Sequence, residues 1–289
     1  MSERQAALVL EDGTVFLGRS FGAQADVDGE VVFCTAMTGY QEICTDPSYR
    51  GQMVVLTHPQ VGNYGVSYSA EESARPLLTA LLVRELADYP HHWESHEDLS
   101  AYLARWGVPG LDGIDTRALT RRLRSHGALR AVLRPAGPRG FSSDDLDWLK
   151  EEARGVTPLS EKLLIPEVSG ITAAPDAESA RQSHVVLVDY GYKSNIARSL
   201  QRRGALVDLV PWDAGYEGIM ARNPDAVLLS NGPGDPAQLA DAVETTRRLI
   251  PSGLPIMGIC LGHQIIGQAA GARTTRLPFG HHGGNHPVK

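Results

Sequence analysis

The stretch that decides the fold is 255–266, which reads PIMGICLGHQII. It begins with apolar residues typical of a buried strand and continues in a helical apolar pattern. Between the two lies GICLG, residues 258–262, with a glycine two positions before the cysteine and another two positions after it. This spacing predicts a tight strand-to-helix turn that projects Cys260 from the carboxyl edge of a sheet.

Cys260 is a candidate nucleophile. The first turn of a helix carries partial positive charge, which favours the thiolate, the reactive form of cysteine. A buried structural cysteine is the alternative, because free cysteine is common in cores. Cys34 and Cys44 lie in β-rich sequence without such glycines, so packing is the better interpretation of both. His263 stays open as a base for Cys260, although a base normally approaches from another segment.

Strands and helices alternate through the second half of the chain. Strands are expected at 184–189, 205–210, 226–230 and 255–259, and helices at 194–203, 236–250 and 261–270. Such alternation predicts an α/β fold with a parallel, doubly wound sheet.

A second motif, SNGPGDP at 230–236, also follows a strand and precedes a helix. With Ala237 it nominally fits a dinucleotide-binding pattern. That interpretation is weak, because the motif follows the third strand of its domain and Pro233 lacks an N–H. The better functional interpretation is a loop whose Gly232 amide faces the reacting centre, and an ordinary Pro-Gly turn is the structural alternative.

The first half of the chain is rich in β-prone runs. Residues 8–16 place two of them around an Asp-Gly turn, which predicts a hairpin. Further strands are expected at 30–35 and 52–57, between turn residues. Helices are expected at 97–106 and 116–126, each begun by a capping Ser or Asp and ended by glycine. The first domain is therefore predicted to be mostly β, of the α+β class.

A change of composition separates the two halves. From 135 to 182 the sequence is rich in Pro, Gly, Ser and charge, with weak periodicity, as is typical of an interdomain connection. We therefore predict an N-terminal domain at 1–150, a linker at 151–182 and an α/β domain at 183–289.

The composition limits the class of protein. With 289 residues, 42% of them hydrophobic, the chain is long enough for two globular domains. Its formal net charge of −7 argues against nucleic-acid binding, which needs a basic surface. No apolar run suffices for a membrane span, and the start has no signal-peptide pattern. No lysine follows a glycine, so a Gly-Lys-Ser/Thr phosphate loop is excluded.

Metal and redox chemistry find little support in the sequence. The 3 cysteines have no Cys-x-x-Cys spacing and cannot all pair, which favours a reducing, cytoplasmic compartment. The histidine-rich stretch 281–286, HHGGNH, has no carboxylate or thiolate in register. No metal site is therefore expected.

A run of arginines follows the predicted start of the helix at 116–126. We expect a solvated helix face with Leu119 and Leu123 packed beneath it, and a surface for a partner is the alternative. The arginines of this run are Arg117, Arg121, Arg122, Arg124, Arg130 and Arg134.

Taken with these motifs, the whole chain resembles the small, glutamine-hydrolysing subunits of carbamoyl-phosphate synthetases. The resemblance rests on stretches in both halves: 37–42 (MTGYQE), 45–49 (TDPSY), 115–117 (DTR), 230–236, 258–264 and 279–288. The motif around Cys260 alone indicates a class I glutamine amidotransferase domain with a flavodoxin-like sheet, and the first-half motifs narrow the family.

The resemblance implies roles for individual residues. Cys260 would attack the side-chain amide of glutamine and form a thioester. The amides of Gly232 and Leu261 would form the oxyanion hole and also contact glutamine. The remaining glutamine-binding residues would be Ser48, Gly234 and Gln264, with Ser48 reaching the site from the first domain.

The resemblance also implies partners. Ammonia would pass through a tunnel to a large subunit in a heterodimer. That subunit would use ATP, Mg and bicarbonate to make carbamoyl phosphate for arginine and pyrimidine synthesis. L-Glutamine is the expected substrate of this chain, and no cofactor is expected in it.

The chain departs from the family pattern at its end. Family members continue beyond 289, through an Asn-containing segment, to a histidine and a glutamate that complete a catalytic triad. Neither follows here, so no general base is assigned and a C-terminally truncated α/β domain is expected. A non-catalytic interaction module is therefore the second hypothesis. Another cysteine hydrolase is disfavoured by the first-half motifs.

Overall fold

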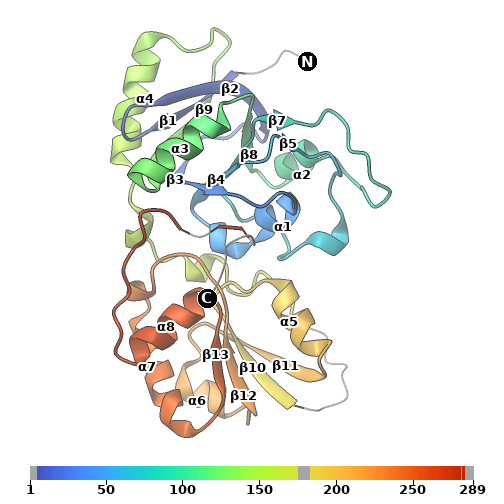
Figure 1. Cartoon of the computed structure of the whole chain (residues 1–289), viewed down its shortest axis with the longest axis vertical. Helices are drawn as coiled ribbons and strands as arrows, with labels where there is room; N and C mark the ends of the chain where they lie inside the picture. Colours follow the sequence, from blue (N-terminus) through green and yellow to red (C-terminus); the bar gives the residue numbers. More distant parts are fainter. Residues whose placement is uncertain (1–4, 175–182, 281, 284–289) are drawn as a thin grey trace.

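The computed structural model describes residues 5–174, 183–280 and 282–283. Two bodies lie one above the other, a β-barrel with its helices and an α/β unit (Figure 1). None of the described helices is long and apolar enough to cross a membrane.

The first body is a closed barrel with the strand order β1-β2-β8-β6-β4-β3-β9. Its strands are β1 (Gln5–Leu10), β2 (Val15–Gly22), β3 (Val27–Cys34), β4 (Gln52–Leu56), β6 (Ala80–Leu82), β8 (Pro109–Asp112) and β9 (Leu129–Pro135). The predicted hairpin is confirmed: β1 pairs antiparallel with β2, and Gly13 takes a positive φ of 86° in the turn. The short strands β5 (Gln60–Val61) and β7 (Glu85–Leu86) pair outside the barrel. The mostly β character of this body is confirmed.

Among the described residues, the α-helices that accompany the barrel are α1 (Tyr40–Thr45), α2 (Leu99–Arg105), α3 (Thr116–His126) and α4 (Ser143–Gly155). Both predicted helices form. The Asp98 carboxylate caps α2 by accepting from the Ala101 N–H at 2.8 Å, and Asp115 caps α3 in the same way through Ala118 at 2.9 Å. Gly127 ends α3 with a φ of 91°.

Helix α4 is a correction to the interdomain connection, with weak periodicity, that was expected from residue 135. A capping box between Ser142 and Asp145 begins it, and its buried Leu149 and Ala153 pack on β1 and β9. The apolar stripe is narrow among many charges, so its periodicity is weak. The helix continues past residue 150, the predicted end of the N-terminal domain. The domain boundaries themselves remain a prediction.

The prediction of a single helix face for the run of arginines is also corrected. Arg130 and Arg134 lie on strand β9, not on a helix face. Arg130 donates to the Glu11 carboxylate at 2.7 Å, and Arg134 pairs with Glu152 of α4. The helical prediction failed because β9 pairs with β1 and β3, which are distant in sequence.

The second body is a parallel sheet in the order β11-β10-β12-β13. Its strands are β10 (Ser183–Asp189), β11 (Ala205–Pro211), β12 (Ala226–Leu229) and β13 (Ile256–Gly258). Its helices are α5 (Ser194–Gln201), α6 (Gly215–Met220), α7 (Ala240–Leu249) and α8 (Leu261–Ala269). The predicted alternation of strands and helices is confirmed.

Helices cover both faces of this sheet. Val186 and Val188 of β10 belong to the cluster that contains buried residues of α6, α7 and α8. Their neighbours Val185 and Leu187 belong to a second cluster with Ala197 of α5. Successive strand residues point to opposite faces, so α5 packs on one face and the other three helices on the opposite one.

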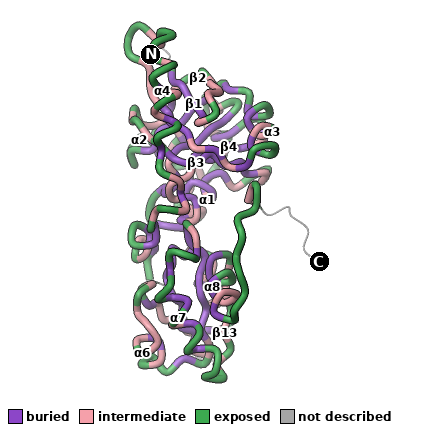
Figure 2. Tube along the Cα trace, turned by 90° about the vertical axis from the view of Figure 1, so that its left-hand side faces the viewer, coloured by how far each residue is buried: buried purple, intermediate pink, exposed green. Residues whose placement is uncertain are grey.

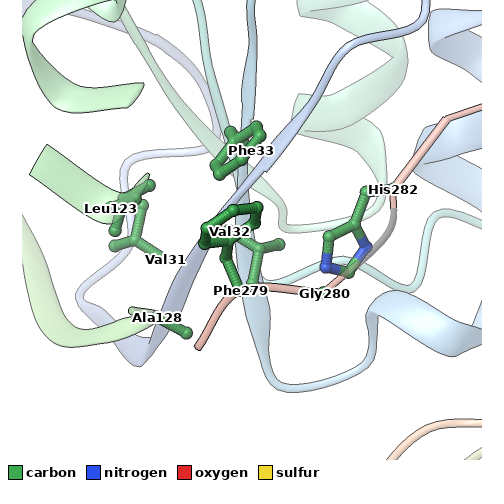
Figure 3. Close-up of a pocket in the computed structure, with 8 residues that line it drawn as sticks. All are labelled: Val31, Val32, Phe33, Leu123, Ala128, Phe279, Gly280 and His282. Carbon is green, nitrogen blue, oxygen red and sulfur yellow. The ribbon is translucent and has the colours of Figure 1, made fainter. Parts of the chain in front are cut away.

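The segment after α8 returns to the barrel. Figure 2 shows it as an exposed length of chain that runs between the two bodies. Arg276 pairs with the buried Glu30, and the Phe279 ring lies 5.7 Å from that of Phe33, centroid to centroid (Figure 3). The Pro278 carbonyl accepts from the Ala128 N–H at 3.2 Å. These contacts tie the α/β unit to the barrel.

Candidate active site

Cys260 lies in a strained turn between β13 and α8. Its backbone takes φ 51° and ψ −106°, a conformation unfavourable for a residue with a side chain. A Cβ on Gly258 would lie 2.4 Å from the Gly262 carbonyl carbon, and a Cβ on Gly262 would lie 2.2 Å from the Leu229 carbonyl oxygen. Only glycine fits at 258 and 262, which is the physical reason for the GICLG spacing.

The Cys260 side chain is exposed, although protein atoms crowd its thiol. Desolvation by these surroundings raises the pKa of Cys260, and the nearby Asp46 carboxylate raises it further. The Leu261 N–H and the Lys193 ammonium act in the opposite direction, without reversing the rise. The helix terminus favours the thiolate through the Leu261 N–H, as expected, but desolvation outweighs this effect and leaves the pKa of Cys260 raised.

Alkylation should distinguish the three cysteines. Desolvation raises the pKa of all three, so accessibility distinguishes them: Cys34 and Cys44 are buried, whereas Cys260 is exposed. Brief iodoacetamide treatment followed by peptide mapping is expected to find Cys260 modified first, by at least about tenfold in rate. Earlier modification of Cys34 or Cys44 in the folded chain would contradict the structure around Cys260.

The alkylation rate of Cys260 should also report the charge of Asp46. Removing this carboxylate removes a cause of the raised pKa, so Asp46→Asn is expected to move the pH midpoint of alkylation to lower pH. Asparagine can still cap a helix, which preserves the local fold. The exposed Asp213, in the α/β unit but not among the groups acting on Cys260, supplies the control Asp213→Asn. An unchanged or higher midpoint in Asp46→Asn would refute this electrostatic account.

The loop 230–236 packs against the turn of Cys260. A Cβ on Gly232 would lie 2.2 Å from the Tyr190 carbonyl oxygen and 2.9 Å from Leu261 Cδ2, so only glycine permits this approach. The buried Gly232 N–H has no acceptor among the described residues. Ser230 holds the loop: its hydroxyl accepts from the Tyr190 N–H at 2.9 Å. Gly234, further along, is exposed and takes a φ of 87°.

Ser48 reaches this loop from the barrel body. Its hydroxyl accepts from Asn231 Nδ2 at 3.0 Å, and the same amide nitrogen donates to the Gly191 carbonyl at 3.0 Å. The Ser48 N–H in turn donates to the Asp46 carboxylate at 2.9 Å. The expected approach of Ser48 from the first domain to the α/β unit is thus present in the structure.

Two residues near Cys260 escaped the sequence analysis, Lys193 and Asp46. Lys193 Nζ lies 3.3 Å from Asp46 Oδ2, across the two bodies. Burial lowers the pKa of Lys193, but Asp46 outweighs this and leaves it raised, so the side chain stays charged. The position of Lys193, just beyond the carboxyl end of β10, could have drawn attention to it, because ligands bind at that edge of such sheets.

Gln264 and His263 lie on α8, one turn after Cys260, and both are exposed. The Gln264 N–H donates to the Cys260 carbonyl at 3.0 Å. In the described residues no hydrogen bond joins the His263 ring to Cys260. No cluster of three metal-ligating side chains occurs in the described part of the chain. Of the stretch 281–286, only His282 and Gly283 lie within it, with the His282 ring 5.6 Å from that of Tyr49.

In comparisons with known proteins, each half of the chain matches a family model. The carbamoyl-phosphate synthase small chain, CPSase domain, matches residues 8–133, and the class-I glutamine amidotransferase domain matches residues 186–289. A carbamoyl phosphate synthase small chain from Symbiobacterium thermophilum is 50% identical over 97% of this chain and 76% of its own length. This chain belongs to the carbamoyl-phosphate synthase small-chain family.

Other members of the family are nearly as similar. The small chain from Chlorobaculum tepidum is 46% identical over 100% of this chain and 78% of its own length. The small chain from Methanopyrus kandleri is 46% identical over 99% of this chain and 78% of its own length. Within the family, the body that carries Cys260 is the class I glutamine amidotransferase domain.

Proposed function

We propose that Cys260 is the nucleophile with which this chain hydrolyses glutamine as the small chain of a carbamoyl-phosphate synthase. The observation that carries the proposal is the strained turn at Cys260, which presents an exposed thiol at the start of α8. Strain at a residue with a side chain is costly and is typical of functional sites. The family supplies the reaction in which such a cysteine would act.

In the proposed reaction the Cys260 sulfur attacks the amide carbon of the glutamine side chain. The amide oxygen then carries the negative charge of a tetrahedral intermediate. Collapse of this intermediate breaks the carbon–nitrogen bond, and the nitrogen takes up the proton that the thiol gave up and leaves as ammonia. A thioester remains on Cys260. Water attacks the thioester, which releases glutamate and restores the thiol.

The N–H groups of Gly232 and Leu261 are the proposed oxyanion hole. Gly232 is supported by its buried N–H, which has no acceptor in the described structure and therefore awaits a partner. Leu261 is supported by its place as the first residue of α8 and by its N–H, which acts to lower the pKa of Cys260. One such donor is worth about a hundredfold to a thousandfold in rate.

Ser48, Gly234 and Gln264 are the proposed contacts to the rest of glutamine, together with Gly232 and Leu261. Support comes from the bond of Ser48 to Asn231, which places its hydroxyl beside the loop, and from the exposure of Gly234 and Gln264. Because Ser48 comes from the barrel, the site would need both bodies.

The Cys260 thiol needs a proton acceptor, since desolvation raises its pKa and so favours the protonated form. In residues 5–174, 183–280 and 282–283 no histidine ring is hydrogen-bonded to Cys260, so we propose no base from among them. His263 stays open on the sequence argument alone.

We further propose the wider assignment that the family suggests. Ammonia would pass to a large subunit that binds ATP and Mg and makes carbamoyl phosphate from bicarbonate, for arginine and pyrimidine synthesis in the cytoplasm. The chain itself would need no cofactor, because its proposed steps use only side-chain and backbone groups. The order β11-β10-β12-β13 supports a flavodoxin-like sheet, whose first strands follow the same order.

A trapping experiment tests the proposal against a non-catalytic interaction module, which the family does not favour. The chain is mixed with radiolabelled glutamine, quenched in acid and digested. We expect label on the peptide that contains Cys260 and free glutamate in the supernatant. Cys260→Ala supplies the control, which should carry no label. Glutamine binding without label or glutamate release would support the interaction module instead.

A further inference from the structure

A pocket lies on the barrel body, apart from the residues around Cys260. It has a volume of about 240 Å³ and is formed by the first turns of α3 and by the residue that follows β4. Its lining residues are Thr57, Thr116, Arg117, Thr120, Arg121 and Arg124. Hydroxyls and guanidinium groups therefore supply most of its donors.

The three arginines of this pocket, Arg117, Arg121 and Arg124, are exposed and have no carboxylate partner among the described residues. By contrast, Arg122 of the same helix pairs with Asp12. The spacing of the three residues places them on one side of α3, where they line one cavity. A chain with a formal net charge of −7 thus concentrates uncompensated positive charge at one point.

The two threonines of α3 supply the second, independent observation. Thr116 is only 3% exposed, and its hydroxyl has no hydrogen-bond partner among the described residues. Thr120 Oγ1 is also buried and unpaired. A buried hydroxyl without a partner costs about 1–3 kcal/mol, so the Thr120 hydroxyl, on a residue that lines the pocket, indicates a ligand that would pair it.

The backbone adds to the attraction for anions. The first turn of α3 directs its N–H groups and the positive end of the helix dipole toward its N-terminus, where Thr116 lies. Asp115 at the cap is the opposing charge, and its carboxylate accepts from the Ala118 N–H at 2.9 Å.

We propose that this pocket binds a phosphoryl group, either as inorganic phosphate or as the phosphate of a small ester. Three guanidinium groups call for a dianion, and a phosphoryl group offers three oxygens for their donors and for the two hydroxyls. A carboxylate has one charge and two oxygens, which leaves part of this donor set unpaired. The volume exceeds the roughly 30 Å³ of a water molecule many times, which leaves room for the body of an ester.

Calorimetric titration of the purified chain at constant ionic strength tests the proposal. The probes are inorganic phosphate, glycerol 3-phosphate and glutarate, a dianion whose charge is divided between two separate carboxylates. We expect saturable binding of phosphate that Arg121→Ala weakens at least about tenfold, as expected for a lost charge-assisted hydrogen bond. Thr120→Val keeps the shape of the side chain and should weaken binding about fivefold. The matched control is Arg122→Ala, whose side chain is paired outside the pocket, with a change within about twofold.

The probes distinguish the two sources of phosphoryl. Tighter binding of glycerol 3-phosphate than of phosphate supports an ester, and equal or weaker binding supports the free ion. Three results would overturn the proposal: no saturable phosphate binding, an equal loss in Arg122→Ala, or binding of glutarate as tight as that of phosphate. The last result would favour an acidic protein segment as the occupant.

Discussion

Cys260→Ser is expected to abolish glutamine-dependent synthesis of carbamoyl phosphate by this chain in complex with the proposed large subunit, by at least about ten-thousandfold. The serine hydroxyl is far less acidic than the thiol and is a poor nucleophile without a strong base. Synthesis from added ammonium should persist, because the proposed role of Cys260 is only to release ammonia. Both rates are measured on one preparation, with carbamoyl phosphate as the product.

The ammonium-dependent rate is the control for the glutamine-dependent rate. The oxygen of serine is smaller than sulfur, and the side chain is exposed, so the fold around the strained turn is expected to survive. Ammonium-dependent synthesis then reports that the complex is intact. Loss of both activities together would argue against separate sites for glutamine hydrolysis and synthesis. Retention of glutamine-dependent synthesis would remove Cys260 as the nucleophile.

Local signals in the sequence predicted the elements that local chemistry determines. The Asp-Gly turn near Gly13 gave the first hairpin, and the aspartates at 98 and 115 gave two helix starts. Closure of the barrel could not be predicted in this way. Strand β8 has only the four residues Pro109–Asp112 and is held by β2 and β6, which are far away in the sequence. Its conformation depends on these partners more than on its own residues.

The candidate site likewise has one part that the sequence predicted and another that it could not predict. The turn at Cys260 follows from glycine spacing, because a Cβ at either neighbouring glycine would collide with the backbone. Lys193 and Asp46 belong to different bodies and meet only through the packing of those bodies. The spacing of residues along the chain does not predict that contact. The raised pKa of Cys260 escaped prediction for the same reason, since Asp46, which contributes to it, lies far from Cys260 in the sequence.

Gly262→Ala is expected to cost the α/β unit about 3 kcal/mol or more in stability and to remove glutamine hydrolysis. The added Cβ would lie 2.2 Å from the Leu229 carbonyl oxygen and 2.7 Å from Leu229 Cβ, at the point where α8 leaves the sheet. Both neighbours belong to Leu229 of β12, so relief requires α8 and the turn of Cys260 to move. Overpacking of this kind typically costs about 1–3 kcal/mol, and a collision with backbone lies at the upper end. Denaturant unfolding and glutamate release measure the two effects.

Gly267→Ala is the matched control, because Gly267 lies on the same helix and a Cβ there meets no atom within 4 Å. Alanine in a helix interior is favoured over glycine by about 0.5–1 kcal/mol, so this variant should be as stable as the parent or more so. It should also retain glutamine hydrolysis. Equal stability of the two variants would show that α8 does not approach β12 as closely as the structure has it. Full activity in Gly262→Ala would mean that the strained geometry of Cys260 tolerates displacement and is not what makes the thiol reactive.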